Sequence, residues 1–272
     1  MMKIAVSEDG KMIDASRLIP TPKDFTNGLQ TIIQIGKELS GGKRFRGVCG
    51  GVPGLLTKEK EILLVSSHLP RWAGRPILKE LERAFGTSVM LENDTALAGL
   101  GEAVVGAGRG KGIVAYLTVS TGVGGVRIVR GKIDVHRLGF EPGHQIIDIG
   151  SAGKPVTLEE CISGSALADR LGIEPGKVIN PAVWDELARI LAYGVNNTVL
   201  HWAPDIVILG GSMITKRVGI KVSEVERYLK QALTIIPLAE QPPVVEAELG
   251  DQGGLHGALA LLRRGDKLGG KV

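Results

Sequence analysis

The sequence predicts an α/β protein, because short apolar runs of β-forming residues alternate with longer stretches of helical periodicity along the 272-residue chain. Glycine is abundant, at 39 residues, whereas aromatic residues make up only 4% of the chain. This balance is typical of strands and helices joined by tight turns, where the backbone approaches another group closely. A change of composition near residues 100–112 predicts two α/β domains around a cleft, residues 1–100 and 101–256. A last helix, about 257–272, should pack back on the first domain.

Local patterns predict each element of the first hundred residues. Residues 3–7 are β-rich and precede a turn at 8–11, which together predict a hairpin. Phe25 to Leu39 carries apolar residues at helical spacing and ends at two glycines, which stop a helix. Further along, we expect a strand within 44–56, a helix over 75–85 closed by Gly86, a strand over 87–92 and a helix over 95–105.

The second half is richer in apolar strands. Two strands joined by a glycine-rich turn are expected within residues 112–133, followed by a loop-rich stretch to about residue 154. Beyond it, we expect helices over 158–171 and 181–202, a buried strand over 205–213 that ends in two glycines, a helix over 222–233, a strand over 244–249 and a helix over 254–264.

Composition excludes several classes of protein. The net charge of +4 is mild, and Lys and Arg form no long run, which argues against nucleic-acid binding. No apolar run approaches the ~20 residues that span a bilayer, and the N-terminus lacks a signal-peptide pattern. We therefore expect a cytoplasmic protein. The two cysteines, Cys49 and Cys161, belong to no CxxC pair and are expected to be reduced and buried.

The triplet Glu92-Asn93-Asp94 lies where a buried strand gives way to a helix. Ligands of α/β folds bind beyond the carboxyl ends of strands, and a carboxylate there can take a proton from a substrate hydroxyl. The alternative is a helix N-cap, because Asn and Asp are the best capping residues. The triplet alone favours capping.

Two glycine-rich turns could receive a nucleotide. In "TVSTGVGG", residues 118–125, small residues between two strands leave backbone N–H groups available to phosphate oxygens, although the spacing of a Walker loop is absent. In "DIVILGGSM", residues 205–213, a strand ends in Gly210 and Gly211, where an adenine or ribose could approach closely. The alternatives are a β-hairpin without ligand and a plain strand-to-helix turn.

Three further polar residues could recognise hydroxyl groups. Glu141 and His144 lie in the Gly/Pro-containing stretch "LGFEPGHQIID", where a carboxylate and an imidazole held together suit a polyhydroxyl ligand, unless the stretch is only a surface loop. Glu159 begins a helix, where its charge would also be favourable for the helix dipole alone.

Taken in order, these motifs resemble the ROK family (repressors, open reading frames and kinases), and within it the ATP-dependent sugar kinases. The most specific parts are "LENDTALAGLGEAVVGAGRG" and "LTVSTGVGG", and the likeness extends from residue 3 to the terminal "GALALL" helix. The resemblance implies an actin-like ATPase fold, with two α/β domains hinged around a cleft that binds sugar and ATP. It also makes a catalytic role for Asp94 more plausible than capping alone.

The resemblance implies a role for each matching position. Asp94 matches the catalytic base that deprotonates the sugar hydroxyl. Positions that match sugar contacts or the loop lining the sugar pocket are Gly51, Pro53, Gly54, Asn93, Glu141, His144 and Glu159. Positions that match the phosphate and adenosine loops are Thr121, Gly122, Gly124, Gly210 and Gly211.

The start of the chain departs from the family pattern. The family's first strand and its phosphate-binding turn have no counterpart, and residues 1–10 match the second strand, so a sheet edge should be left unpaired. Because the likeness begins at once, we hypothesise that Met1 is a misassigned start; an in-frame stop codon directly upstream would rule this out. The alternative is a true loss of the turn, with poor phosphorylation.

The region after His144 also departs from the pattern. Many family members bind a structural zinc there, but Thr157 stands at the place of the last cysteine ligand and Cys161 falls inside a helix. Zinc needs about four N or S ligands, so no zinc is predicted. Phe140 and Pro142 replace the residues more usual beside Glu141, which affects the sugar contacts. The family's repressors carry a helix-turn-helix ahead of the kinase-like part; we recognise none in this sequence and therefore do not expect DNA binding.

The sequence therefore favours an ATP- and Mg²⁺-dependent kinase of a hexose or N-acetylhexosamine, with Mg²⁺ inferred from the chemistry of ATP. The alternative is a catalytically impaired sugar- or nucleotide-binding protein of the same fold. The resemblance also implies a homodimer formed through the second domain, with helices in residues 158–202 as a candidate surface. The identity of the sugar is not encoded in these motifs, because hexoses differ by single hydroxyl groups.

Overall fold

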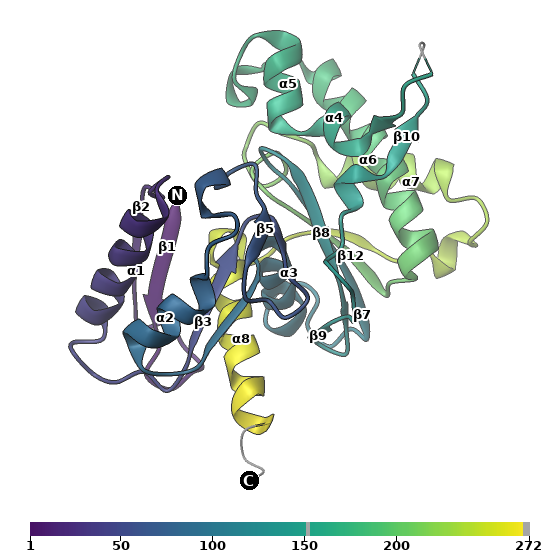
Figure 1. Ribbon diagram of the computed structural model, residues 1–272. Coiled ribbons are helices and arrows are strands. Elements are labelled where there is room, and N and C mark those ends of the chain that lie inside the picture. Colours follow the sequence, from purple (N-terminus) through teal and green to yellow (C-terminus); the bar gives the residue numbers. More distant parts are fainter. Residues whose placement is uncertain (151–152, 269–272) are drawn as a thin grey trace. The chain divides into compact units, whose positions relative to one another are not determined.

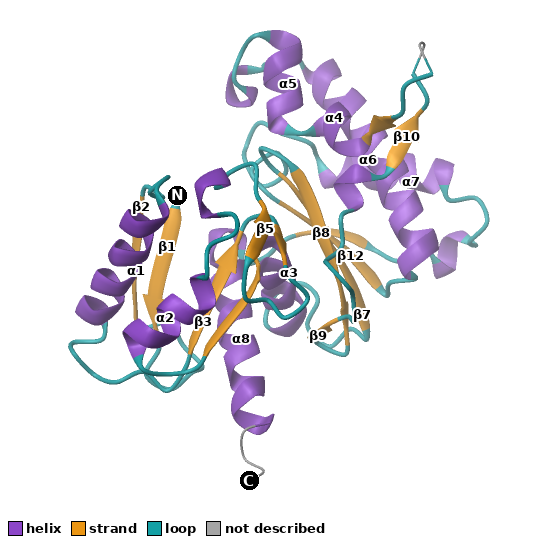
Figure 2. Cartoon of the chain, viewed as in Figure 1, coloured by secondary structure: helices purple, strands orange, loops and turns teal. Residues whose placement is uncertain are grey.

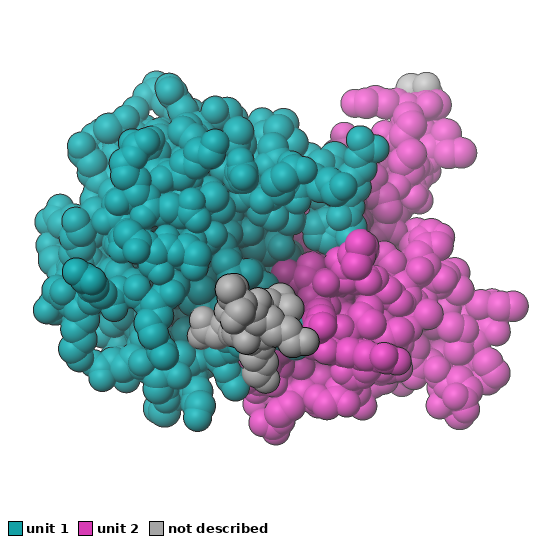
Figure 3. Space-filling model, turned by 60° about the horizontal axis from the view of Figure 1, so that its bottom comes forward, with its two compact units in different colours: residues 1–101, 136–139, 254–272 teal, residues 102–135, 140–253 magenta. Residues whose placement is uncertain are grey.

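The computed structural model describes residues 1–150 and 153–268 and confirms the α/β class (Figures 1 and 2). Its contacts divide the chain into two compact units, coloured separately in Figure 3. Unit 1 comprises residues 1–101, 136–139 and 254–272, and unit 2 comprises residues 102–135 and 140–253. The predicted C-terminal helix is present, and residues 269–272 of that prediction lie outside the described residues.

Within the part of the chain that the structure describes, no helix is both long enough and apolar enough to cross a membrane.

Among its described residues, unit 1 contains three two-stranded sheets and the helices packed on them. Its elements, in chain order, are β1 (Met2–Val6), β2 (Ala15–Ile19), α1 (Phe25–Leu39), β3 (Val48–Val52), β4 (Leu55–Leu56), β5 (Leu63–Val65), the 3₁₀-helix η1 (Pro70–Trp72), α2 (Ile77–Phe85), β6 (Val89–Asn93), most of α3 (Asp94–Val104) and nearly all of α8 (Gly253–Leu268). One of these sheets is the small antiparallel hairpin of β4 and β5.

The strands of unit 1 pair only locally. β1 and β2 form the predicted antiparallel hairpin, and β3 runs parallel to β6, with Gly51 opposite Glu92 and Val52 opposite Asn93. Among the described strands, β1 pairs with β2 alone and β3 with β6 alone, so each keeps one edge without a strand partner. The sequence predicted an unpaired edge of this kind.

Helix α1 has the bounds that the sequence predicted. The carboxylate of Asp24 accepts the N–H of Asn27 at 3.0 Å and caps its first turn. Gly41 and Gly42, at φ 58° and 78°, end it, because a left-handed backbone suits glycine. The helix packs on Trp72 through Gly28, where a β-carbon would overlap the indole ring.

Unit 2 is built on one mixed sheet, in the order β13-β12-β7-β8-β9. β13, β12 and β7 run parallel, and β7, β8 and β9 run antiparallel. Its strands are β7 (Ile113–Val119), β8 (Val123–Val129), β9 (Lys132–Ile133), β10 (Ile146–Asp148), β11 (Val156–Thr157), β12 (Ile206–Gly210) and β13 (Val244–Glu246). Its helices are η2 (Pro142–His144), α4 (Leu158–Ile162), α5 (Gly164–Leu171), η3 (Pro175–Lys177), α6 (Pro181–Trp202), α7 (Val222–Ala232), η4 (Leu238–Glu240) and η5 (Gly250–Gln252).

Helices α4, α6 and α7 cover one face of this sheet and share its core with the side chains of Leu117, Val119, Val207 and Leu209. Helix α6 has the predicted bounds. Its Gly194 leaves room for Leu158 of α4, whose Cδ2 lies 2.5 Å from the position that a β-carbon would occupy. This close approach fixes the start of α4, which carries Glu159.

Two predictions for unit 2 need correction. The single helix expected over 158–171 is broken at Ser163, whose backbone is extended. Ser163 is the C-cap of α4 and the N-cap of α5, where its side chain accepts the N–H of Ala166 at 3.1 Å. Cys161 is a free thiol but is only partly buried, and the same is true of Cys49 in unit 1. Burial nevertheless raises the pKa of Cys49 to about 12, so its thiol stays protonated.

The end of α3 is anchored by a buried acid. Glu102 is 1% exposed. Its carboxylate accepts backbone N–H groups from Ala107 at 3.1 Å, Glu248 at 3.1 Å and Leu249 at 2.7 Å. A buried carboxylate is stable only when it is hydrogen-bonded in this way, so Glu102 holds two loops of unit 2 on the last turn of α3.

The packing of α8 on α3 gives a first prediction. A β-carbon on Gly257 would lie 2.6 Å from the carbonyl carbon of Leu97, whereas one on Gly254, in the same helix, would meet no atom within 4 Å. We expect Gly257→Ala to lower the free energy of unfolding by about 1–3 kcal/mol, because the two backbones must separate. Gly254→Ala should be neutral or stabilising by up to about 1 kcal/mol. Urea unfolding measures both, and equal values would contradict this packing.

Candidate active site

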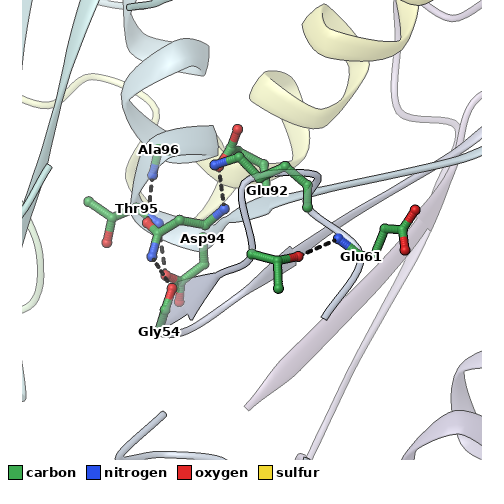
Figure 4. A network of polar contacts seen from close by, with 9 residues as sticks. Gly54, Glu61, Glu92, Asp94, Thr95 and Ala96 are labelled. Carbon is green, nitrogen blue, oxygen red and sulfur yellow. Dashed lines mark hydrogen bonds and ion pairs between the residues drawn. The ribbon is translucent and has the colours of Figure 1, made fainter. Parts of the chain in front are cut away.

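The side chain of Asn93 holds the junction of β6 and α3, where Gly54, Asp94 and Ala96 are labelled in Figure 4. Its Oδ1 accepts the N–H of Ala96 at 3.0 Å, and its Nδ2 donates to the carbonyl oxygen of Gly54 at 3.1 Å. Asn93 therefore caps α3 and ties the helix start to the loop after β3. The capping role that the sequence allowed for the triplet belongs to Asn93.

Asp94, the next residue, has a different environment. It is open to solvent, and its Oδ1 accepts the N–H of Thr95 at 2.8 Å. Desolvation by the surrounding protein raises the pKa of its carboxyl group above the ordinary value for aspartate, and the N–H of Thr95 and nearby His68 oppose that rise. A carboxylate with a raised pKa is a stronger proton acceptor than an ordinary surface aspartate. The carboxylate of Asp94 does not act as the N-cap of α3, because Asn93 has that role.

Two glycines allow the loop after β3 to approach this junction. A β-carbon on Gly51 would lie 3.2 Å from the Cα of Asp94. Gly54 has φ 119°, and a β-carbon there would overlap the backbone of Val65 and lie 3.0 Å from the Cβ of Ser66. Gly51 therefore lies against Asp94, and Gly54 is hydrogen-bonded to Asn93.

Two residues beside this junction were not predicted from the sequence. The Nζ of Lys60 lies 2.8 Å from Oε1 of Glu92, the first residue of the triplet. His68 lies close enough to Asp94 to lower the pKa of its carboxyl group. A histidine four residues before a tryptophan gives no sequence signal of its own, and only the fold places it here.

In unit 2, the predicted phosphate turn connects β7 and β8 and is held from both sides. The carbonyl oxygen of Ser120 accepts the N–H of Gly164 at 2.7 Å, and that of Thr121 accepts the N–H of Ser165 at 3.3 Å, so the turn rests on the start of α5. The Oγ atoms of Ser120 and Ser212 lie 3.0 Å apart. The turn is thus fixed by hydrogen bonds before any ligand binds.

Glu159 completes this turn. Its Oε2 accepts the N–H of Val123 at 2.7 Å, and a β-carbon on Gly122 would lie 2.7 Å from the same oxygen. Its position at the start of α4 therefore serves a specific contact as well as the helix dipole. The structure brings together Gly122, predicted to contact phosphate, and Glu159, predicted to contact sugar.

Glu141 directly precedes η2 and His144 is its last residue, and η2 packs on β8. A β-carbon on Gly125 would lie 2.6 Å from Cγ of Pro142, so the glycine in β8 leaves room for the proline ring. Both Glu141 and His144 are exposed. Desolvation raises the pKa of Glu141, nearby His144 lowers it, and the charge of Glu159 raises it.

The departures at residues 140 and 142 thus have a packing explanation. Besides the contact of Pro142, the ring of Phe140 lies edge-on to Trp202, with centroids 5.2 Å apart. Thr157, at the place of a family zinc ligand, instead forms a capping box with Glu160 at the start of α4. Within the described ranges, no group of three or more His, Cys, Asp or Glu residues is arranged to hold a metal.

The predicted adenosine turn lies beside the phosphate turn. The N–H of Met213 donates to the carbonyl oxygen of Val119 at 3.0 Å. Gly211 has φ 90°, and a β-carbon there would lie 2.5 Å from Oγ1 of Thr118. A β-carbon on Gly210 would lie 2.6 Å from the hydroxyl of Tyr116. Both glycines are therefore required by close packing as well as suited to a ligand.

The predicted residues fall into two groups. In unit 1 the structure gathers Gly51, Pro53, Gly54, Asn93 and Asp94, and in unit 2 it gathers Thr121, Gly122, Gly124, Glu141, His144, Glu159, Gly210 and Gly211. Each group lies within its own unit. Gly124 lies in β8, opposite Thr118 of β7.

Known proteins resemble this chain over most of its length. The family model described as "ROK family" matches residues 1–265. A glucokinase of Thermotoga maritima is 28% identical over 250 residues, which cover 76% of this chain and 77% of that protein. An N-acetyl-D-glucosamine kinase of Vibrio atlanticus is 26% identical over 280 residues, covering 91% of each.

Solved structures agree with these sequence relatives. A ROK hexokinase from Thermus thermophilus superposes with a TM-score of 0.78 at 25% identity, covering 97% of this chain and 100% of that chain. A ROK family glucokinase from Streptomyces griseus, in complex with glucose and AMPPNP, gives the same TM-score and identity, covering 96% of each chain. These likenesses confirm the actin-like ATPase fold that the sequence implied.

The contact between Gly122 and Glu159 gives a second prediction. The backbone of Gly122 lies outside the left-handed region, so Gly122→Ala would act only through its new β-carbon, which must push the Glu159 carboxylate from Val123. Because the carboxylate ends a flexible side chain, the cost comes from the buried N–H of Val123, which loses its acceptor; we expect a loss of about 1–3 kcal/mol in the free energy of unfolding and faster amide exchange at Val123. Gly176→Ala, at an open position of the same unit, is the control. If both variants behave alike, Glu159 does not hold the turn.

Proposed function

Because this chain belongs to the ROK family, we propose that it is a sugar kinase that transfers the γ-phosphoryl group of ATP to a hydroxyl group of a hexose or an N-acetylhexosamine. The substrate classes come from the relatives, which are named glucokinase and N-acetyl-D-glucosamine kinase. A relative of known structure binds glucose together with the ATP analogue AMPPNP.

Asp94 is the proposed general base, and the state of its carboxylate is the observation that carries the proposal. It lies at the carboxyl end of β6, is open to solvent, has a raised pKa and leaves the capping of α3 to Asn93. In the reaction it would accept the proton of the sugar hydroxyl while that oxygen bonds to the γ-phosphorus and the bond to ADP breaks. General-base catalysis of this kind contributes about 10²–10⁴-fold.

Sugar recognition is assigned to both groups of residues. In unit 1, Asn93 has one amide hydrogen beyond its bond to Gly54, and Gly51, Pro53 and Gly54 would line the pocket. In unit 2, the exposed side chains of Glu141 and His144 can contact hydroxyl groups. Glu159 has a second carboxylate oxygen besides the one that accepts the N–H of Val123.

The turn between β7 and β8 would receive the phosphates. Its glycines leave no side chain over the backbone, and within the described residues the N–H groups of Thr121 and Gly122 have no protein acceptor. Such paired N–H groups bind phosphate oxygens well. Gly210 and Gly211 would lie against adenosine. Mg²⁺ would neutralise phosphate charge. It would be carried by the nucleotide, since the described residues offer it no carboxylate cluster.

A coupled assay of ADP release tests the proposed activity directly. Glucose, mannose, N-acetylglucosamine, N-acetylmannosamine and N-acetylgalactosamine should be tried with ATP and Mg²⁺, and at least one should support turnover. Asp94→Asn should lower kcat by about 10²–10⁴-fold, because the base is lost while the shape of the site is kept. Asp169→Asn, at an exposed position of α5, should leave kcat unchanged.

Two outcomes would contradict the proposal. Full activity of Asp94→Asn would remove the assigned base. Binding of a sugar by calorimetry without turnover of any sugar would instead favour a non-catalytic binding protein of the same fold.

The raised pKa of Asp94 predicts how activity and stability respond to pH. The acid limb of kcat/KM should titrate above 3.8, the ordinary value for aspartate, because protonation removes the base. A carboxyl group with a raised folded-state pKa also destabilises the protein as pH rises through that pKa. Asp94→Asn should therefore melt at a higher temperature than the wild type at neutral pH, and the gap should shrink in acid. A gap that is constant with pH would contradict the raised pKa.

A further inference from the structure

Lys60 occupies an unusual backbone position in the loop that joins β4 to β5. Its φ of 60° lies in the left-handed region that glycine adopts most easily. The turn is held by the N–H of Lys60, which donates to the carbonyl oxygen of Thr57 at 2.9 Å, while Oγ1 of Thr57 accepts the N–H groups of Glu61 and Ile62. This backbone conformation is unfavourable for lysine, and a contact of its side chain can offset that cost.

That contact is with a buried acid. The Nζ of Lys60 donates to Oε1 of Glu92 at 2.8 Å, and the two side chains are only 24% and 9% exposed. The same oxygen of Glu92 accepts the backbone N–H of Asn93 at 2.8 Å. Because a buried carboxylate without partners is costly, Glu92 depends on these two donors.

The ion pair between Lys60 and Glu92 is one of two contacts between the segment of residues 54–60 and the β6–α3 junction, and Glu92 and Gly54 are labelled in Figure 4. At the other end, the carbonyl oxygen of Gly54 accepts a hydrogen bond from the side chain of Asn93. Residues 54–60 are therefore tied to the β6–α3 junction at both ends, once by a neutral hydrogen bond and once by an ion pair. The ion pair ends on Glu92 and the hydrogen bond on Asn93, the two residues that precede Asp94.

We propose that Lys60 is a positioning residue of the sugar site: its ammonium group, acting through Glu92, fixes the direction in which Asn93 and Asp94 present their side chains. The inference rests on the proposed kinase function, in which a small displacement of the base is costly to catalysis. Lys60 itself touches neither reacting group in this assignment.

Three variants of Lys60 separate the charge from the backbone conformation. Lys60→Met removes the ammonium group and keeps the length of the side chain, Lys60→Arg keeps the charge, and Lys60→Gly relieves the left-handed backbone. The control is Lys58→Met, because Lys58 is an exposed lysine of the same loop. All variants should first be shown to fold by circular dichroism and urea unfolding.

We expect Lys60→Met and Lys60→Gly to lower kcat by about tenfold and to raise the KM for sugar, because the base and Asn93 are no longer held. The KM for ATP should stay within about twofold of wild type, since the phosphate turn lies in unit 2. Lys60→Arg should recover most of the lost kcat, and Lys58→Met should match wild type.

Amide hydrogen exchange gives a readout that needs no turnover. In Lys60→Met, the N–H groups of Asn93 and Ala96 should exchange faster, and in Lys58→Met they should not. If no sugar is phosphorylated by the wild type, the proposed function fails while exchange still decides whether Lys60 holds the junction. Unchanged exchange, wild-type kinetics of Lys60→Met, or wild-type kcat of Lys60→Gly would each overturn the inference.

Discussion

The hydrogen bonds of the Asn93 side chain are the constraint on which the candidate site of unit 1 depends. One side chain caps α3 through Ala96 and binds the carbonyl oxygen of Gly54. The helix start and the loop after β3 are therefore positioned by the same amide group. Removing this amide group would leave an unsatisfied N–H at the helix start and would also release the loop, so the positions of the helix start and the loop are coupled.

In unit 2, a carboxylate that accepts a hydrogen bond, rather than an amide, positions a loop. There a carboxylate, that of Glu159, accepts a backbone N–H from Val123 and fixes a turn between two strands. The absence of a β-carbon at Gly122 allows this approach. In both units, then, a polar side chain from one element binds the backbone of a loop. Rigid loops of this kind lower the entropy lost when a ligand binds.

Sequence patterns predicted those elements whose signals are local and complete. Helix α1 has its cap, its periodicity and its glycine stop within one segment, and α6 likewise begins with Asn180 and Pro181. The break at Ser163 was missed because apolar spacing continues across it, and a serine gives a cap only when the backbone extends. The turn of Lys60 was missed because nothing local marks a lysine with positive φ. The contact that accompanies this backbone conformation, the ion pair between Lys60 and Glu92, joins residues 32 positions apart.

The division of labour between Asn93 and Asp94 also explains why a base can sit at a helix start. A carboxylate that caps a helix accepts two or three N–H groups, and its pKa falls far below the usual value, so it becomes a weak proton acceptor. Asp94 accepts the N–H of Thr95, and desolvation outweighs this bond and raises its pKa. By satisfying Ala96, Asn93 spares Asp94 the capping role that would have lowered its basicity. An acid at position 93 could also cap α3, but only an amide can at the same time donate a hydrogen bond to the carbonyl oxygen of Gly54.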